Sequence, residues 1–89
     1  MKMTVGTTPV SMQTIYLDSD VAPSVVRPIV QNLGPGDVFI GMSGDGITNL
    51  ADEGLKLIPD ALLEFPRMNK TLRFVASQAD TEIRVLDLG

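Results

Sequence analysis

The 89-residue chain is predicted to form one small all-β domain. We expect a β-sandwich or jelly-roll-like barrel of about seven to eight short antiparallel strands, because turn-forming Gly, Pro, Asn and Asp residues recur about every 8–12 residues. The hydrophobic fraction of 44% is that of a folded protein, and no linker, repeat or low-complexity tract divides the chain. Residues 1–11 are expected to form an N-terminal arm, and residues 12–89 a single β domain.

The N-terminal third is predicted to hold the first strands. Residues 1–11 are polar and loosely patterned, which indicates an arm or a first edge strand rather than core. Met12–Leu17 alternates in the β manner and is ended by the turn residues 18–20. The next run extends from Val25 to Gln31. Because Pro28 cannot donate to a β-ladder, that strand either lies at an edge there or begins at Pro28.

The clearest pattern in the chain is the hairpin-like segment Ile29–Met42. Residues 32–37 (NLGPGD) are a dense cluster of turn formers between two apolar strands. The second strand lies within Asp37–Met42, and its apolar run Val38–Ile40 is ended by Gly41. Residues 43–46 (SGDG) predict a tight turn whose glycines can supply positive φ. We expect this segment to be the frame of the domain rather than a site.

The C-terminal half is predicted to continue with short strands after a turn at residues 52–54. The expected strands are Leu55–Ile58, Ala61–Phe65, Thr71–Ser77 and Glu82–Leu88. The main alternative is a helix over Leu50–Leu63, whose apolar residues partly fit a 3.6-residue period. Gly54 and Pro59 interrupt that period, which favours the strands.

The composition excludes most catalytic chemistry. The chain has no Cys and no His, so it lacks disulfides, Cys-based metal centres and the commonest general base. We therefore expect no enzyme, with no catalytic, cofactor-binding or metal-binding residues. The basic residues are scattered and the net charge is −4, which argues against binding of nucleic acid. No apolar segment approaches the ~18 residues of a membrane span, and no signal peptide is visible, so we expect a soluble chain.

Carboxylates in or beside turns are the remaining candidates for metal binding: Asp18, Asp20, Asp45, Asp52 and Glu53. A calcium loop of the EF-hand kind that started at Asp18 would need an oxygen ligand at its fifth position and Gly at its sixth. Ala22 and Pro23 stand there, so the pattern fails. We interpret these carboxylates as solvated turn residues, with a weak cation site that bridges two chains as the alternative.

Two glycine-rich turns partly resemble known functional motifs, the nucleophile elbow and the phosphate-binding loop, but neither motif is complete. Ser43 lies in GMSGD, which approaches the nucleophile elbow G-x-S-x-G, but Asp45 replaces the last glycine and no His can activate the hydroxyl. Gly34-Pro35-Gly36 lacks the lysine of a phosphate-binding loop. The basic residues Arg67, Lys70 and Arg73 are interpreted as surface residues in salt bridges rather than as a phosphate site.

Aromatic residues are scarce, at 4% of the chain with no Trp, so the core must consist mainly of Val, Leu, Ile and Met. Phe39, Phe65 and Phe74 lie in predicted strands and are expected to pack in the core, and Tyr16 lies in another. Scattered methionines are expected to fill gaps in the core. A small core without large aromatic anchors often gains stability from neighbouring subunits.

An ordered set of segments resembles a class of small phage virion structural proteins, the capsid decoration (cement) proteins with a β-sandwich fold. These segments are IVQNLG (29–34), GDVFIGMS (36–43), GI (46–47), GLKL (54–57), LRFVAS (72–77) and IRVL (83–86). The resemblance covers about residues 25–88. The chain departs from the pattern at Ala61–Lys70, which is longer and more apolar and is a candidate contact loop.

The resemblance implies a non-enzymatic protein that stabilises a phage head by binding repeated sites on the capsid. Its expected partners are the major capsid protein and copies of itself, as a homotrimer, without nucleic acid, membrane, cofactor or small-molecule substrate. The expected location is the virion, assembled in the host cytoplasm. A tail, baseplate or head–tail connector component is the alternative. A stand-alone carbohydrate- or ligand-binding β domain is a further alternative, which the absence of Trp and the single Tyr disfavour.

Overall fold

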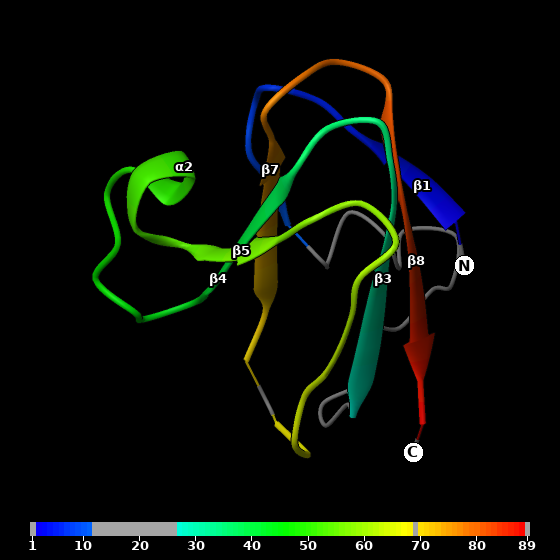
Figure 1. Cartoon of the computed structure of the whole chain (residues 1–89). Coiled ribbons are helices and arrows are strands. Elements are labelled where there is room, and N and C mark those ends of the chain that lie inside the picture. The colour runs from blue at the N-terminus through cyan, green and yellow to red at the C-terminus, as the bar shows by residue number, and fades with distance from the viewer. Residues whose placement is uncertain (1, 12–26, 69, 89) are drawn as a thin grey trace.

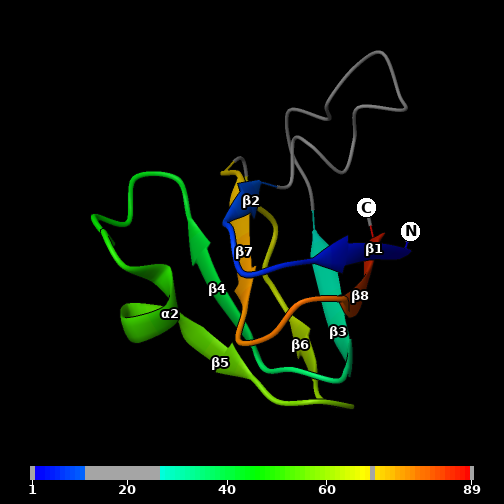
Figure 2. The same ribbon diagram turned by 90° about the horizontal axis from the view of Figure 1, so that it is seen from above.

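Two antiparallel sheets of four strands each face one another in the computed structural model, which describes residues 2–11, 27–68 and 70–88 (Figures 1 and 2). Sheet A has the order β1 (Lys2–Val5), β8 (Thr81–Asp87), β3 (Pro28–Gly34) and β6 (Leu62–Glu64). Sheet B has the order β2 (Val10–Ser11), β7 (Leu72–Ala76), β4 (Val38–Met42) and β5 (Leu55–Leu57). The predicted all-β sandwich is confirmed.

The core lies between the two sheets because inward and outward side chains alternate along the longer strands. In β8, for example, Thr81, Ile83 and Val85 are buried, whereas Arg84 and Leu86 are exposed. The largest side chains that are almost completely buried are those of Phe74, Ile40, Leu72, Ile83, Val5, Val30 and Val38. The core is therefore mainly aliphatic, with Phe74 as its largest fully buried side chain, as the composition predicts.

The remaining aromatic and sulfur-containing side chains are distributed unevenly around this core. Phe65 joins it at 6% exposure, whereas Phe39 is half-buried and lies outside the buried cluster, contrary to expectation. Strand alternation explains the difference, since the neighbouring Val38 and Ile40 both point inward. Several partly buried methionines pack against the core, as the gap-filling interpretation expects: Met3, Met42 and Met68.

The segment Ile29–Met42 is not a hairpin. Its two strands, β3 and β4, belong to different sheets, so the turn between them is an arch that crosses from one layer to the other (Figure 2). The partners of β3 are β8 and β6, and those of β4 are β7 and β5. Turn-forming residues mark where a chain reverses, but they do not say whether the flanking strands pair, which explains the error.

The segment predicted to be a turn before β5 contains a single turn of helix, α2 (Leu50–Glu53). The alternative of a helix over Leu50–Leu63 holds only for these four residues, because β5 and β6 follow. The helix packs on the outer face of sheet B through the buried Leu50 (Figure 2). Gly41 permits this contact, since a Cβ there would lie 2.6 Å from Leu50 Cδ1.

The N-terminal residues form strands at the edges of both sheets. The segment was expected to be an arm or a first edge strand, and within residues 2–11 the structure has edge strands, with β1 paired to β8 and β2 paired to β7. Val5 differs from the expectation that this segment avoids the core, because it is fully buried. The strand β3 begins at Pro28, where a missing N–H removes no bond from the strand interior. The predicted strand Met12–Leu17, with Tyr16, lies outside the described residues.

Candidate functional site

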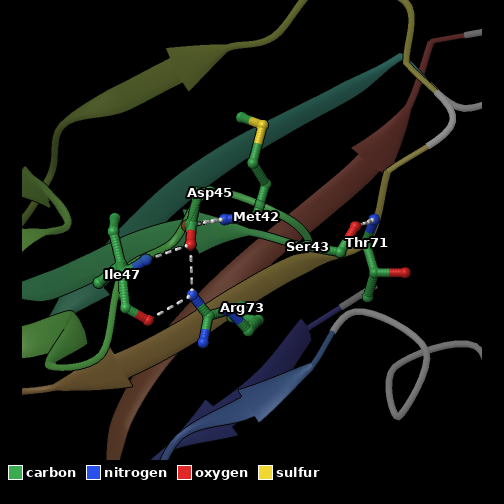
Figure 3. A network of polar contacts seen from close by, with 6 residues as sticks. All are labelled: Met42, Ser43, Asp45, Ile47, Thr71 and Arg73. Atoms are coloured by element: carbon green, nitrogen blue, oxygen red, sulfur yellow. Dashed lines mark hydrogen bonds and ion pairs between the residues drawn. The ribbon is translucent and has the colours of Figure 1, made fainter.

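The SGDG turn after β4 is held by the carboxylate of Asp45 (Figure 3). Its Oδ2 accepts a hydrogen bond of 2.7 Å from the backbone N–H of Met42, and its Oδ1 accepts one of 2.8 Å from that of Ile47. The Arg73 guanidinium on β7 donates to Oδ1 at 2.8 Å and to the Ile47 carbonyl at 3.4 Å. Together these contacts tie the loop after β4 to the outer face of sheet B.

The chemistry of this network is structural. Two backbone N–H donors and the neighbouring Arg73 hold the pKa of Asp45 below its ordinary value, although burial acts in the opposite direction. Ser43 accepts a hydrogen bond of 3.1 Å from the Thr71 backbone N–H, so its hydroxyl joins two chain segments. Asp45 has its oxygens occupied by protein donors, which leaves it poorly placed to ligate a cation. This agrees with its interpretation as a turn residue.

The Gly34-Pro35-Gly36 turn is held from inside the sandwich. The amide nitrogen of Asn32 donates to the Gly36 carbonyl at 2.9 Å and to the Leu57 carbonyl at 2.8 Å, and its oxygen accepts from the Gly34 N–H at 2.7 Å. Thr81 Oγ1 accepts from the Gly36 N–H at 3.1 Å. Asn32 and Thr81 are both completely buried, so these bonds satisfy backbone groups that water cannot reach. Sequence reasoning missed both residues.

The other charged candidates do not come together. Asp52 and Glu53 are exposed on α2, and Arg67 and Lys70 are exposed on the segment after β6, whereas Arg73 bonds to Asp45. Within residues 2–11, 27–68 and 70–88, no group of three or more carboxylates is arranged to hold a metal ion. Asp18 and Asp20 lie outside the described residues.

The outer face of sheet A presents two rows of neighbouring side chains. The strand register places Lys2, Arg84, Gln31 and Leu62 side by side in one row across the four strands. The next row places Leu86 beside Ile29 and Ile29 beside Glu64. We call these seven outward-facing residues the sheet A face.

The middle of the sheet A face is hollow and mainly apolar. A shallow depression of about 160 Å³ is lined by Ile29, Gln31, Leu62, Arg84 and Leu86. The side chains of Leu62 and Leu86 are unusually open for leucine, with 55% and 56% of their residue surfaces exposed. The segment expected to be a contact loop, 61–70, thus contributes Leu62 to this surface. The signal in the sequence was the alternation in β8, which places Arg84 and Leu86 on the same outward side.

A second hollow, of about 320 Å³, lies beside α2 on the outer side of sheet B. Thr7 and Pro9 of the β1–β2 connection, with Thr48 and Asn49 before α2, line it around Val75. Its polar groups are neutral hydroxyls and one amide, without a charged side chain among the lining residues. It therefore offers no strong electrostatic attraction for a ligand.

Comparison with known proteins gives no relative from which to transfer a function. No family model matches the chain, and no match was found among curated proteins or among solved structures. In the part of the chain that the structure describes, no helix has the length and apolar character needed to cross a membrane.

Proposed function

We propose that this chain is a non-enzymatic structural protein of a phage virion, most specifically a capsid decoration (cement) protein. The observation that carries the proposal is the sheet A face, an apolar hollow with charged side chains on the strands beside it. Apolar centres with polar rims are the usual anatomy of protein interfaces. The ordered segments that resemble small virion proteins give the class of assembly.

The charge distribution supports docking through this face. Arg84 lines the hollow, and two basic side chains (Lys2 and Arg27) and three acidic ones (Glu64, Glu82 and Asp87) lie on the strands beside it, which gives a local net charge of zero. The rest of the chain then holds four basic and eight acidic residues, a net charge of −4. An acidic partner is therefore repelled least at the sheet A face, and complementary charges favour this orientation on approach.

The proposed partners are the major capsid protein and further copies of this chain in a homotrimer, and the proposed location is the virion. A decoration protein stabilises a shell by burying apolar surface at many equivalent contacts, which requires no catalytic residues. In this proposal the chain needs no metal, cofactor, nucleic acid or small-molecule substrate. A tail, baseplate or connector component is the second candidate, because the same face would suit either assembly.

Quantitative mass spectrometry of purified particles tests the proposal. We expect on the order of hundreds of copies per particle, since a decoration protein follows the symmetry of the shell. A count of about six to twelve would instead indicate a ring-shaped tail or connector assembly. Absence of the chain from particles would refute a virion role.

Rebinding to particles that lack the chain tests the docking face. The double variant Leu62→Ser with Leu86→Ser should remain folded, because both leucines are largely exposed, and should lose most of its binding. Leu55→Ser is the matched control, since Leu55 is 57% exposed on β5 of the other sheet. Equal binding by all three proteins would refute docking through the sheet A face.

A further inference from the structure

We propose that Arg84 makes the sheet A face selective for an extended partner segment that carries a carboxylate two positions from an apolar residue, on the same side of the segment. The apolar group would enter the hollow, and the carboxylate would pair with the Arg84 guanidinium. This inference rests on the proposed function only in that the sheet A face is the docking surface.

The hollow fits one side chain of a partner. A cavity of roughly 150 Å³ accommodates a benzene-sized group, whereas sites for drug-sized ligands usually exceed about 300 Å³. The hollow has about 160 Å³, and Ile29, Leu62 and Leu86 supply its apolar walls. Gln31 adds an amide beside Arg84, which suits the backbone or polar edge of an extended chain.

Of the three basic side chains in and beside the hollow, two form ion pairs and Arg84 does not. Lys2 Nζ lies 3.3 Å from Glu82 Oε2, and Arg27 lies 2.7 Å from Glu64 Oε1. Among the described residues, the Arg84 guanidinium has no hydrogen-bond or ion-pair partner. Arg84 lines the apolar hollow, and its guanidinium N–H groups are available to a carboxylate of a partner. An arginine can bind a carboxylate through two parallel hydrogen bonds.

The strand register strengthens the preference for an anion. Lys2 and Arg84 are direct cross-strand partners, and like charges at such positions repel. Glu82 offsets the charge of Lys2 but does not bond to Arg84. A carboxylate from a partner would relieve this repulsion, whereas a second cation would increase it.

The spacing of the site indicates what the partner presents. Arg84 and Leu86 are two residues apart on one strand, a separation of about 7 Å along the sheet. An extended partner that lies along β8 matches this spacing with an apolar residue and an Asp or Glu two positions away. From Glu82 to Arg84, β8 is paired on one side with β1 and on the other with β3, so recognition at Arg84 would occur through side chains rather than by strand addition.

A pair of capped tripeptides tests the preference: leucine-threonine-glutamate and its matched counterpart leucine-threonine-glutamine. NMR titration of the full chain should show shifts at Arg84 Nε–H and at the methyl groups of Ile29, Leu62 and Leu86. The glutamate peptide should bind about three- to tenfold more tightly than the glutamine peptide, as expected of one charge-assisted contact on a partly exposed surface.

Two variants separate Arg84 from general charge effects. Arg84→Gln should abolish the preference for the glutamate peptide, whereas Arg67→Gln should retain it, because Arg67 is an exposed arginine outside the sheet A face. Equal binding of the two peptides, a preference that survives Arg84→Gln, or shifts confined to another surface would overturn the inference.

The particle assay distinguishes this failure from failure of the proposed function. If Arg84→Gln binds particles as the wild type does while the Leu62 and Leu86 double variant does not, the docking face stands and the role of Arg84 is refuted. If the double variant also binds normally, the docking face itself is refuted. Loss of binding with Arg84→Gln, but not with Arg67→Gln, supports the inference.

Discussion

Asn32 lies at the centre of the arch between the two sheets, and we expect its replacement by alanine to destabilise the whole domain. The side chain makes three hydrogen bonds, to the backbone of Gly34, Gly36 and Leu57. The first two belong to the arch itself, and the third belongs to β5 on the opposite sheet. The substitution therefore removes a polar connection between sheet A and sheet B as well as the support of a turn.

The magnitude follows from the number of bonds and their burial. A net value of about 1 kcal/mol for each hydrogen bond gives a loss of about 3 kcal/mol, and more if the buried backbone groups stay unpaired. A chain of 89 residues is expected to have a free energy of unfolding of roughly 4–13 kcal/mol. Asn32→Ala therefore removes between about a quarter and most of the stability.

Urea unfolding followed by far-ultraviolet circular dichroism measures this loss. With a slope of about 1 kcal/mol per molar urea for a small domain, the midpoint should fall by about 3 M. If Asn32→Ala does not fold, Thr81→Val provides a milder test, because it preserves shape and removes two hydrogen bonds, one with the Gly36 N–H and one with the Gln78 carbonyl. Its expected cost is about 2 kcal/mol.

Asn49→Ala is the matched control. Asn49 is an exposed asparagine that precedes α2, and its side chain makes no capping hydrogen bond. Its substitution should change stability by less than about 0.5 kcal/mol. A structural role for Asn32 is refuted if the free energy of unfolding of Asn32→Ala lies within about 0.5 kcal/mol of the wild-type value. It is also refuted if the two asparagine variants lose the same free energy of unfolding.

The remaining predictions concern the loop after β4. Gly41→Ala should lower the free energy of unfolding by about 1–3 kcal/mol in thermal denaturation, because its methyl group would overlap both Leu50 Cδ1 and Asp45 Oδ2. Gly6→Ala should be nearly neutral, since no atom outside its chain neighbours lies within 4 Å of the new Cβ. Equal effects of the two substitutions would contradict the close packing at Gly41. The lowered pKa of Asp45 implies a stabilising contribution that is complete above its ordinary value near 4 and is lost as the pH falls through the lowered pKa. Melting temperatures between about pH 2 and pH 6 should therefore fall less steeply for Asp45→Asn than for the wild type, and parallel profiles would show that the carboxylate is not responsible.

The fold class could be predicted from the sequence because its signals are local. Turn formers between the strands mark the strand ends, and in Thr81–Asp87 buried and outward side chains alternate. The pairing of strands is not local. Residues 29–42 carry the strongest turn signal in the chain, yet β3 and β4 lie in different sheets. The arch between them is held by an Asn32 side chain that donates to the Gly36 carbonyl and a Thr81 hydroxyl that accepts from the Gly36 N–H.

The candidate site illustrates the same limit. Asp45 was identified as a turn residue, but its partner Arg73 is 28 positions away, and only the adjacency of β4 and β7 brings them together. Arg84 was one of several scattered basic residues in the sequence. Its relation to Leu62 across β3 depends on the register of three strands, which no pattern within a single segment determines.

The two outer surfaces of the sandwich differ in a way that bears on how a partner is bound. On sheet B, Leu50 packs against Gly41. The Asp45–Arg73 pair holds the loop after β4 against the same surface (Figure 3), so the chain itself occupies this part of the sheet. On sheet A, the hollow lies on the middle strands β3 and β8 with β6 at its side, so the regular backbone bonds of the sheet hold its walls in place. A surface fixed in this way loses little conformational entropy when it is covered. We therefore expect binding at the sheet A face to shift side-chain signals of Arg84 and its apolar neighbours while the backbone of β3 and β8 stays unchanged, as in other preorganised interfaces.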